Sequence, residues 1–399
     1  MLSKRVHYFR YELKMKRIVL YLLPAMIDVL IGVFFFVATV RMAESGASAT
    51  AVSAIMTLWG VAYMVSCFVI SRILNSRIAP FLIAAAGIVM AAGTVAAMIF
   101  TSLHAQYLFA PVLAAGAALF FPAFMIFFAQ YEADRSGGIA RSTAVYTFAW
   151  SMGLGAGPFA AGFIWVNFGW RWCYAVNLAL CCLTLAGFAW LQKSPAAAPA
   201  PAAPGDLESA VNRAGYNFVW LGWVASGMCL LGGAIIRAVF PVSAASLSIP
   251  KSDQGITLAL MCLGQAIAAL LISRSRTWMY RASVVATFGA LGFAAILAFG
   301  FASSAWAFHA ASFLFGIYSG VALIYMIFHA LADPACAGKN IGINETIVGV
   351  AVIIGPAMGG ALADRFGLRS PFITAAVLIA AAAALQWVVH AKKPLRNQG

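Results

Sequence analysis

The sequence predicts an all-α integral membrane protein whose 12 transmembrane helices form two six-helix pseudo-repeats. The first observation is composition: the chain is 64% hydrophobic and only 9% charged, whereas soluble domains carry about 25% charged residues. The second is that apolar segments of about 18 residues or more recur along the chain, each long enough to cross a bilayer as a helix. The third is a sequence repeat half a chain apart.

The repeat lies in GPFAAGFIWVNFGWRWCY (157–174) and GPAMGGALADRFGLRSPF (355–372). Two stretches that match in this way indicate that each half is one copy of the same unit. The matched residues are Gly157 and Gly355, Pro158 and Pro356, Gly162 and Gly360, Phe168 and Phe366, Gly169 and Gly367, and Arg171 and Arg369.

Twelve spans account for the apolar segments. The basic N-terminus resembles the start of a signal peptide, whose apolar region is about 7–15 residues long. The run 18–40 is longer and contains Asp28, so we expect a retained first span. The expected spans are 18–40, 50–71, 80–101, 107–130, 142–165, 172–191, 216–241, 253–273, 282–302, 306–330, 341–363 and 371–390.

An Ala/Pro-rich segment separates the two halves. Its composition favours an extended linker over a packed unit. The expected organisation is a basic juxtamembrane segment (1–17), an N-terminal bundle (18–192), a cytoplasmic linker (193–215), a C-terminal bundle (216–391) and a cytoplasmic tail (392–399).

Lysine and arginine are distributed unevenly about these spans. With both termini in the cytoplasm, the opposite side carries only Arg41, Arg171, Lys251, Arg365 and Arg369. Cytoplasmic loops are normally the ones enriched in these residues. The net charge of +14 therefore indicates topology, and we expect no nucleic-acid partner. The seven cysteines form no metal-ligand pattern, and neither a metal nor a cofactor is expected.

SMGLGAGPFAAG (151–162) resembles motif C of the major facilitator superfamily (MFS) of secondary transporters, and GPAMGG (355–360) is a second copy. With the paired six-span halves, the whole chain resembles a 12-span MFS protein of the drug and metabolite exporter branch. Small residues let transmembrane helices approach closely, so we expect span five to form a gating seam with its counterpart in the other half. The expected gating and packing residues are Gly155, Gly157, Pro158, Gly162, Gly355, Pro356, Gly359 and Gly360.

A second family motif is displaced. ALADRFGLR (361–369) resembles the charged turn that the family places between spans two and three, but here it follows span eleven. We expect Asp364 and Arg365 to form an ordinary turn. The expected position, SRILNSRIAP (71–80), lacks the acidic residue.

Two carboxylates are candidates for proton coupling. Asp28 lies about eleven residues into span one, close to the membrane midplane at 1.5 Å per residue, on one face with Gly32. An ionisable residue inside a span is a functional candidate by default; the alternative is a structural hydrogen bond. Glu345 opens span eleven, where it is either a coupling group or a helix N-terminal charge.

Arg237 in span seven is the main candidate for substrate binding. A guanidinium keeps its charge, so it binds an anionic group, pairs with a carboxylate or snorkels to the outer headgroups. A direct pair with Asp28 is not favoured. Further substrate-binding candidates, each also explicable as packing or headgroup contacts, are Tyr318, Tyr325, His329, Tyr146, Trp150, Gln265 and Asn344.

These features predict a secondary active transporter that works by alternating access in a bacterial inner membrane, as a monomer surrounded by lipid. Proton-coupled efflux of a hydrophobic or amphipathic metabolite or drug is expected first. The alternative is proton-coupled uptake of a small nutrient, anions included, and H⁺ is favoured over Na⁺. A non-transporting receptor, a scramblase or a membrane enzyme is a minor alternative, because no catalytic motif accompanies His329 and Asp333.

Overall fold

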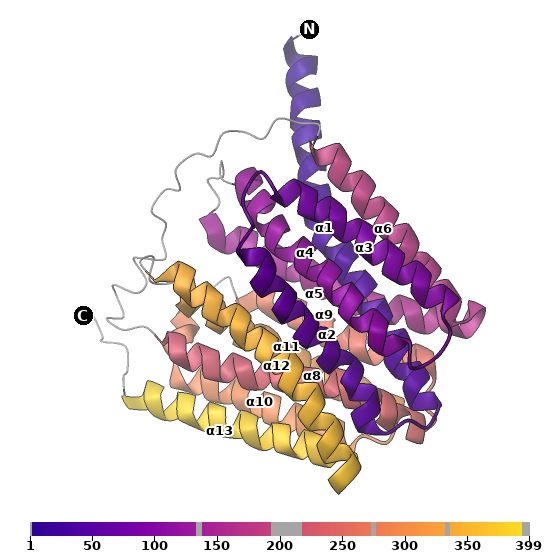
Figure 1. Ribbon diagram of the computed structural model, residues 1–399. Helices are drawn as coiled ribbons and strands as arrows, with labels where there is room; N and C mark the ends of the chain where they lie inside the picture. The colour runs from indigo at the N-terminus through magenta and orange to yellow at the C-terminus, as the bar shows by residue number, and fades with distance from the viewer. Residues whose placement is uncertain (1, 133–137, 193–217, 273–276, 332–335, 393–399) are drawn as a thin grey trace.

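The computed structural model describes residues 2–132, 138–192, 218–272, 277–331 and 336–392 (Figure 1). The linker predicted at 193–215 lies wholly outside these residues, and of the tail predicted at 392–399 only Lys392, the last residue of α13, is described. Within the described residues the structure is helical and contains no strand. The long helices are α1 (Leu2–Glu44), α2 (Ala49–Ser71), α3 (Ala79–Ile99), α4 (Gln106–Glu132), α5 (Gly138–Phe168), α6 (Trp170–Gln192), α8 (Val219–Ser246), α9 (Lys251–Ile272), α10 (Ala282–Phe301), α11 (Ala305–Leu331), α12 (Ala337–Phe366) and α13 (Ser370–Lys392).

The prediction of twelve spans is confirmed by these twelve long helices. Eleven of them are long and apolar enough over their described residues to cross a membrane, and α5 is the exception. Most helices begin and end within a few residues of the predicted spans. The largest difference is at α1, where the basic segment after Met1 continues the first span as one helix. A short 3₁₀ helix, η1 (Thr277–Tyr280), precedes α10 and was not predicted.

The six helices α1–α6 and the six helices α8–α13 pack in equivalent ways. In the first half α1 packs on α5, and α3 packs on α4 and α6. In the second half α8 packs on α12, and α10 packs on α11 and α13. Two seams join the halves, α5 against α9 and α12 against α2, so that the halves exchange equivalent contacts (Figure 1).

The first glycine of each GP motif brings two helices of the same half together. A Cβ atom placed on Gly157 would lie 2.5 Å from the carbonyl oxygen of Val29 in α1. A Cβ on Gly355 would lie 3.0 Å from the carbonyl oxygen of Leu231 in α8. Only a residue without a side chain allows these backbones to approach so closely.

The second glycine of each motif packs across the halves. A Cβ on Gly162 would lie 2.6 Å from the carbonyl oxygen of Lys251 in α9, and one on Gly360 would lie 2.8 Å from that of Ala49 in α2. The prediction that span five forms a seam with its counterpart, span eleven, is therefore wrong. Span five (α5) packs on span eight (α9), because the symmetry of the halves exchanges the fifth helix of one with the second helix of the other.

The glycines that follow α5 and α12 end these helices in the same way. Gly169 and Gly367 have φ angles of 90° and 89°. No atom lies within 4 Å of the position that a Cβ would take at either glycine. Their repetition is therefore explained by backbone conformation, since glycine adopts positive φ without the steric cost that a Cβ imposes.

The short turns after α1, α5, α8 and α12 lie together at one end of the bundle, which we call the far end; the helix ends flanking residues 193–217 lie at the other, the linker end (Figure 1). At the far end Lys251 pairs with Glu44 at 2.5 Å and lies over the ring of Trp165. Asp364 accepts hydrogen bonds from the backbone N–H groups of Ala49 (2.8 Å) and Thr50 (2.9 Å). The residue expected to form an ordinary turn thus caps α2 of the other half.

Replacing either turn glycine should destabilise the protein. We expect Gly169→Ala and Gly367→Ala each to cost about 1 kcal/mol, because a Cβ disfavours positive φ. The measurement is thermal unfolding of the purified protein in detergent. Gly342→Ala is the matched control, because Gly342 lies inside α12 with nothing within 4 Å of the Cβ position; alanine there should be neutral or slightly stabilising. Equal shifts at the three positions would contradict this explanation.

Removing the Asp364 cap should cost more than removing the far-end ion pair. Asp364→Ala deprives two N–H groups of their acceptor and should cost about 1 kcal/mol, whereas Asp364→Asn retains one acceptor oxygen and should cost less. Glu44→Gln should cost about 0.5 kcal/mol or less, because the pair is partly exposed to solvent. The same unfolding assay ranks the three variants, and a larger loss for Glu44→Gln would reverse the interpretation.

Candidate functional site

Asp28 is a buried carboxylate near the middle of the apolar part of α1, Met15–Glu44. Its side chain is 2% exposed. Its Oδ2 atom has no hydrogen-bond partner among the described residues. The structural hydrogen bond considered as the alternative from sequence is therefore not formed at this oxygen. A carboxyl group in this position can serve as a site that takes up and releases a proton.

The helix face that carries Asp28 packs against the small residues of α5. A Cβ on Gly153 would lie 2.8 Å from the Cα of Ala25, and one on Gly32 would lie 2.9 Å from the carbonyl oxygen of Leu154. Asp28 lies three residues after Ala25 and four before Gly32, so it shares this face. The small residues of α5 thus determine the surroundings of the Asp28 carboxylate.

The Cys262 thiol of α9 lies near Arg237 of its own half and faces the first half through Gly155 of α5. Cys262 lies beside the Arg237 guanidinium, within electrostatic range of Asp28, and a Cβ on Gly155 would lie 2.7 Å from its Cβ. Among the described residues no ion pair joins Asp28 and Arg237, in agreement with the expectation that a direct pair is not favoured. The sequence indicated Cys262 only as a small apolar residue.

The Arg237 guanidinium points toward the middle of α8. Its Nη1 atom would lie 3.4 Å from a Cβ on Gly233, one turn nearer the start of the helix. Gly233 lies about midway along Val219–Ser246. Snorkelling to the far-end surface would direct the side chain toward Pro241 instead. The positive charge is therefore held at the level of Asp28 and Cys262.

Gln265 links the two halves through hydrogen bonds. Its Nε2 donates a hydrogen bond to Ser151 Oγ of α5 (2.7 Å), and its Oε1 accepts one from Ser319 Oγ of α11 (2.9 Å). All three groups are buried. Ser151 and Ser319 were missed from sequence, because a serine in an apolar span carries no signal of its partner. Both polar atoms of Gln265 thus bind protein partners, with one donor hydrogen and one acceptor lone pair used.

Three candidates of α11 lie within the packing of the C-terminal half. Tyr318 packs beside Gly292 of α10. The Tyr325 hydroxyl lies 2.8 Å from His390 Nε2 of α13. His329 lies edge-on to Tyr280 and Tyr325 in an aromatic cluster near the linker end. Shared spacing placed them on one face of α11. Tyr325 and His329 pack toward α13 and η1, so we leave these two out of the proposed site. Tyr318 lies beside Phe315 and within electrostatic range of Cys229 in α8.

The remaining candidates are scattered. Trp150 is half-buried on α5, and the side chain of Tyr146 lies outside the described residues. Asn344 accepts a hydrogen bond from Trp223 Nε1 (2.7 Å), which joins α12 to α8. Glu345 is exposed near the linker end of α12, close to Cys67 of α2. Glu345 is therefore not part of the central region.

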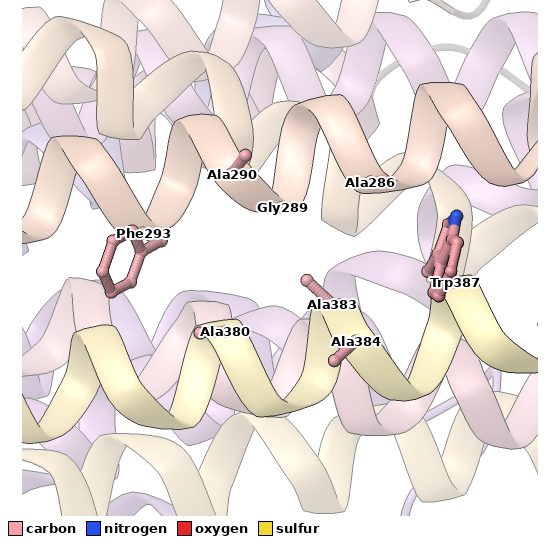
Figure 2. Close-up of a pocket in the computed structure, with 8 residues that line it drawn as sticks. All are labelled: Ala286, Gly289, Ala290, Phe293, Ala380, Ala383, Ala384 and Trp387. Carbon is pink, nitrogen blue, oxygen red and sulfur yellow. The ribbon is translucent and has the colours of Figure 1, made fainter.

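An apolar groove of about 310 Å³ lies between α10 and α13. Figure 2 shows Phe293 and Trp387 at its two ends, with alanine and glycine residues between them. Phe293 and Trp387 are 37% and 51% exposed. The groove contains no charged side chain, and its lining residues belong to α10 and α13, which carry neither Asp28 nor Arg237, so it is not the candidate site.

The sequence of the C-terminal half matches the family model "Major Facilitator Superfamily" over residues 222–398. No curated protein matches the sequence significantly.

Solved structures resemble the fold of nearly the whole chain. A bacterial homologue of the human lysosomal transporter Spinster, in an inward-facing and unoccupied conformation, has a TM-score of 0.69 and 14% identity over 96% of this chain and 97% of that chain. The nucleoside transporter NupG has a TM-score of 0.65 and 13% identity over 95% and 98%. The human organic anion transporter MFSD10 has a TM-score of 0.63 and 15% identity over 93% and 99%.

At these identities the structural matches establish the fold alone. Two duplicated six-helix halves agree with the organisation predicted from sequence. The match to the Major Facilitator Superfamily model covers the C-terminal half of the chain, and the likeness to solved transporters covers the fold of nearly the whole chain.

Proposed function

We propose that the protein is a proton-coupled secondary transporter that moves a small organic solute by alternating access, with Asp28 as the proton site. The observation that carries this proposal is the buried Asp28 carboxylate, whose Oδ2 has no partner among the described residues. A structural carboxylate at this depth would be paired, since an uncompensated charge in the membrane is costly. A carboxylate that must alternate between two protonation states has a reason to remain unpaired.

The contacts between the halves support alternating access. The polar contacts that the described residues make between the halves lie at the far end or in the middle of the bundle. The excess of Lys and Arg in the linker-end segments favours cytoplasmic termini. We take the protein to act as a monomer in an inner membrane. In that orientation the far end, where these contacts lie, faces outward, which supports an inward-facing state.

Two directions of transport were expected from sequence. Efflux of an amphipathic metabolite is favoured by the resemblance of the GP motifs to those of exporters. Both motifs, however, have the same packing role in their own halves. A packing role is compatible with either direction of transport, so the motifs do not distinguish efflux from uptake. Uptake of a small anion is favoured by the Arg237 guanidinium at the level of Asp28. The similar structures are named for nucleosides and for organic anions, so the shared fold selects neither direction nor substrate.

Neutralising Asp28 should uncouple transport from the proton gradient. In proteoliposomes, Asp28→Asn should abolish solute accumulation driven by a pH gradient but retain exchange of solute for solute, because the binding site remains. Solutes for this assay come from a thermal-shift screen of the purified protein against metabolites and drugs. Asp253→Asn is the control, because Asp253 lies at the first turn of α9 near His309. Accumulation by Asp28→Asn at the wild-type rate would refute the assignment.

The same vesicles determine direction and coupling ion. Symport accumulates solute when the external medium is the more acidic side, and exchange accumulates it when the lumen is. Replacing Na⁺ by choline should leave both rates unchanged. Chemical conversion of the solute would instead indicate an enzyme, and a bound solute that never crosses would indicate a receptor.

A further inference from the structure

The charge on Arg237 has no acidic partner among the described side chains. Three of the five described acids are engaged at the far end: Glu44 with Lys251, Asp253 beside His309, and Asp364 on α2. Glu345 lies near the linker end of α12. Asp28 lies on α1 of the other half and forms no ion pair with Arg237 among the described residues. A guanidinium inside the membrane either pairs with an anion or faces a water-filled cavity, and Arg237 is half-buried.

The surroundings of the guanidinium are apolar or neutral. A Cβ on Gly233 would lie 3.4 Å from Arg237 Nη1 and 3.6 Å from the Phe315 ring, and the thiols of Cys229 and Cys262 lie nearby. An aromatic edge and two thiols suit an apolar solute body, whereas the guanidinium suits a carboxylate, with which it can form a bidentate pair. One guanidinium compensates one negative charge, which favours a monoanion.

We propose, resting on the proton-coupled transport proposed above, that the substrate is a small organic monoanion whose acid group binds Arg237 and which is bound together with one proton on Asp28. With Asp28 ionised and no solute, the charges of Asp28 and Arg237 cancel. With Asp28 protonated, the site carries one positive charge, and a bound monoanion cancels it. Both states are neutral, and mixed states are disfavoured because charges interact strongly where water is excluded.

No other charged side chain is described at the level of Asp28. The titratable groups near the middle of these helices are Tyr63 of α2, Cys181 and Cys182 of α6, Cys229 and Arg237 of α8, Cys262 of α9 and Tyr318 of α11. The described residues of α4 and α5 bring none to this level. Thiols and phenols are ordinarily uncharged near neutral pH, so Asp28 and Arg237 determine the net charge of the site.

Matched acids and amides test the proposed substrate class. The probes are benzoate, phenylacetate and hexanoate, each beside its uncharged amide, in thermal unfolding of the full-length protein at pH 6 and pH 8. We expect at least one acid to raise the unfolding temperature, more strongly at pH 6, with uptake of about one proton per anion bound, and its amide to have no effect. The proposal would be overturned if the amides raised the unfolding temperature as much as their acids, or if none of the acids raised it.

Variants locate the two charges. Arg237→Gln should weaken binding of the active acid at least tenfold, and Arg237→Lys should weaken it less, because it keeps the charge but loses the planar fork. Asp28→Asn should retain binding but lose proton uptake and the dependence on pH. Arg171→Gln is the matched control, because Arg171 lies at the far end beside Trp170. If Arg237→Gln fails to fold, the proposal is tested by acid binding to Arg237→Lys and by the binding of the acids to the wild-type protein at pH 6 and pH 8.

The outcomes separate this inference from the proposed function. Proton-driven transport of a neutral or cationic solute that is unchanged in Arg237→Lys would overturn the anion site but leave Asp28 as the proton site. Binding of an acid that depends on Arg237, with accumulation at the wild-type rate in Asp28→Asn, would overturn the coupling assignment and with it the joint binding of proton and anion.

Discussion

Close approach of helix backbones through glycine is the constraint on which the structure depends. In a membrane, lipid tails are as apolar as leucine side chains, so packing depends on van der Waals contact between closely fitted surfaces. The GP motifs supply such surfaces twice in each half. Gly157 and Gly355 join a helix to its own half, and Gly162 and Gly360 join it to the other half. The position of Asp28 follows from this, since its helix face is the one that packs on α5.

Much of the fold could be predicted from sequence because its signals are local. Apolar runs indicated the helices, and the repeated GP and FG residues indicated the duplication, with Gly169 and Gly367 in the same backbone conformation. The partners of the helices could not be predicted in this way. The sequence shows that α5 and α12 are equivalent, but equivalence does not determine contact, and it led to the wrong partner at the seam.

Only those residues of the candidate site could be predicted whose charge inside a membrane span makes them stand out. Asp28 and Arg237 are recognisable because a charge inside a span is expensive. Tyr318, Tyr325 and His329 share a helix face, but the sequence does not show which neighbour that face meets. Asp364 shows the opposite error: it was expected to form only a turn, and it caps a helix that begins more than 300 residues earlier. Spacing along one helix carries no information about such partners.

The Asp364 cap links the hydration of α2 to the separation of the two halves. The amides of Ala49 and Thr50 have their acceptor on another helix of the opposite half, whereas the Ser48 hydroxyl accepts a hydrogen bond from the Ala51 amide. If the halves separate here, the two backbone N–H groups lose Asp364 as their acceptor and must form hydrogen bonds with water instead. The reason is that the first N–H groups of a helix have no acceptor inside the helix. Since these donors belong to the main chain, no side-chain change on α2 short of proline removes that requirement.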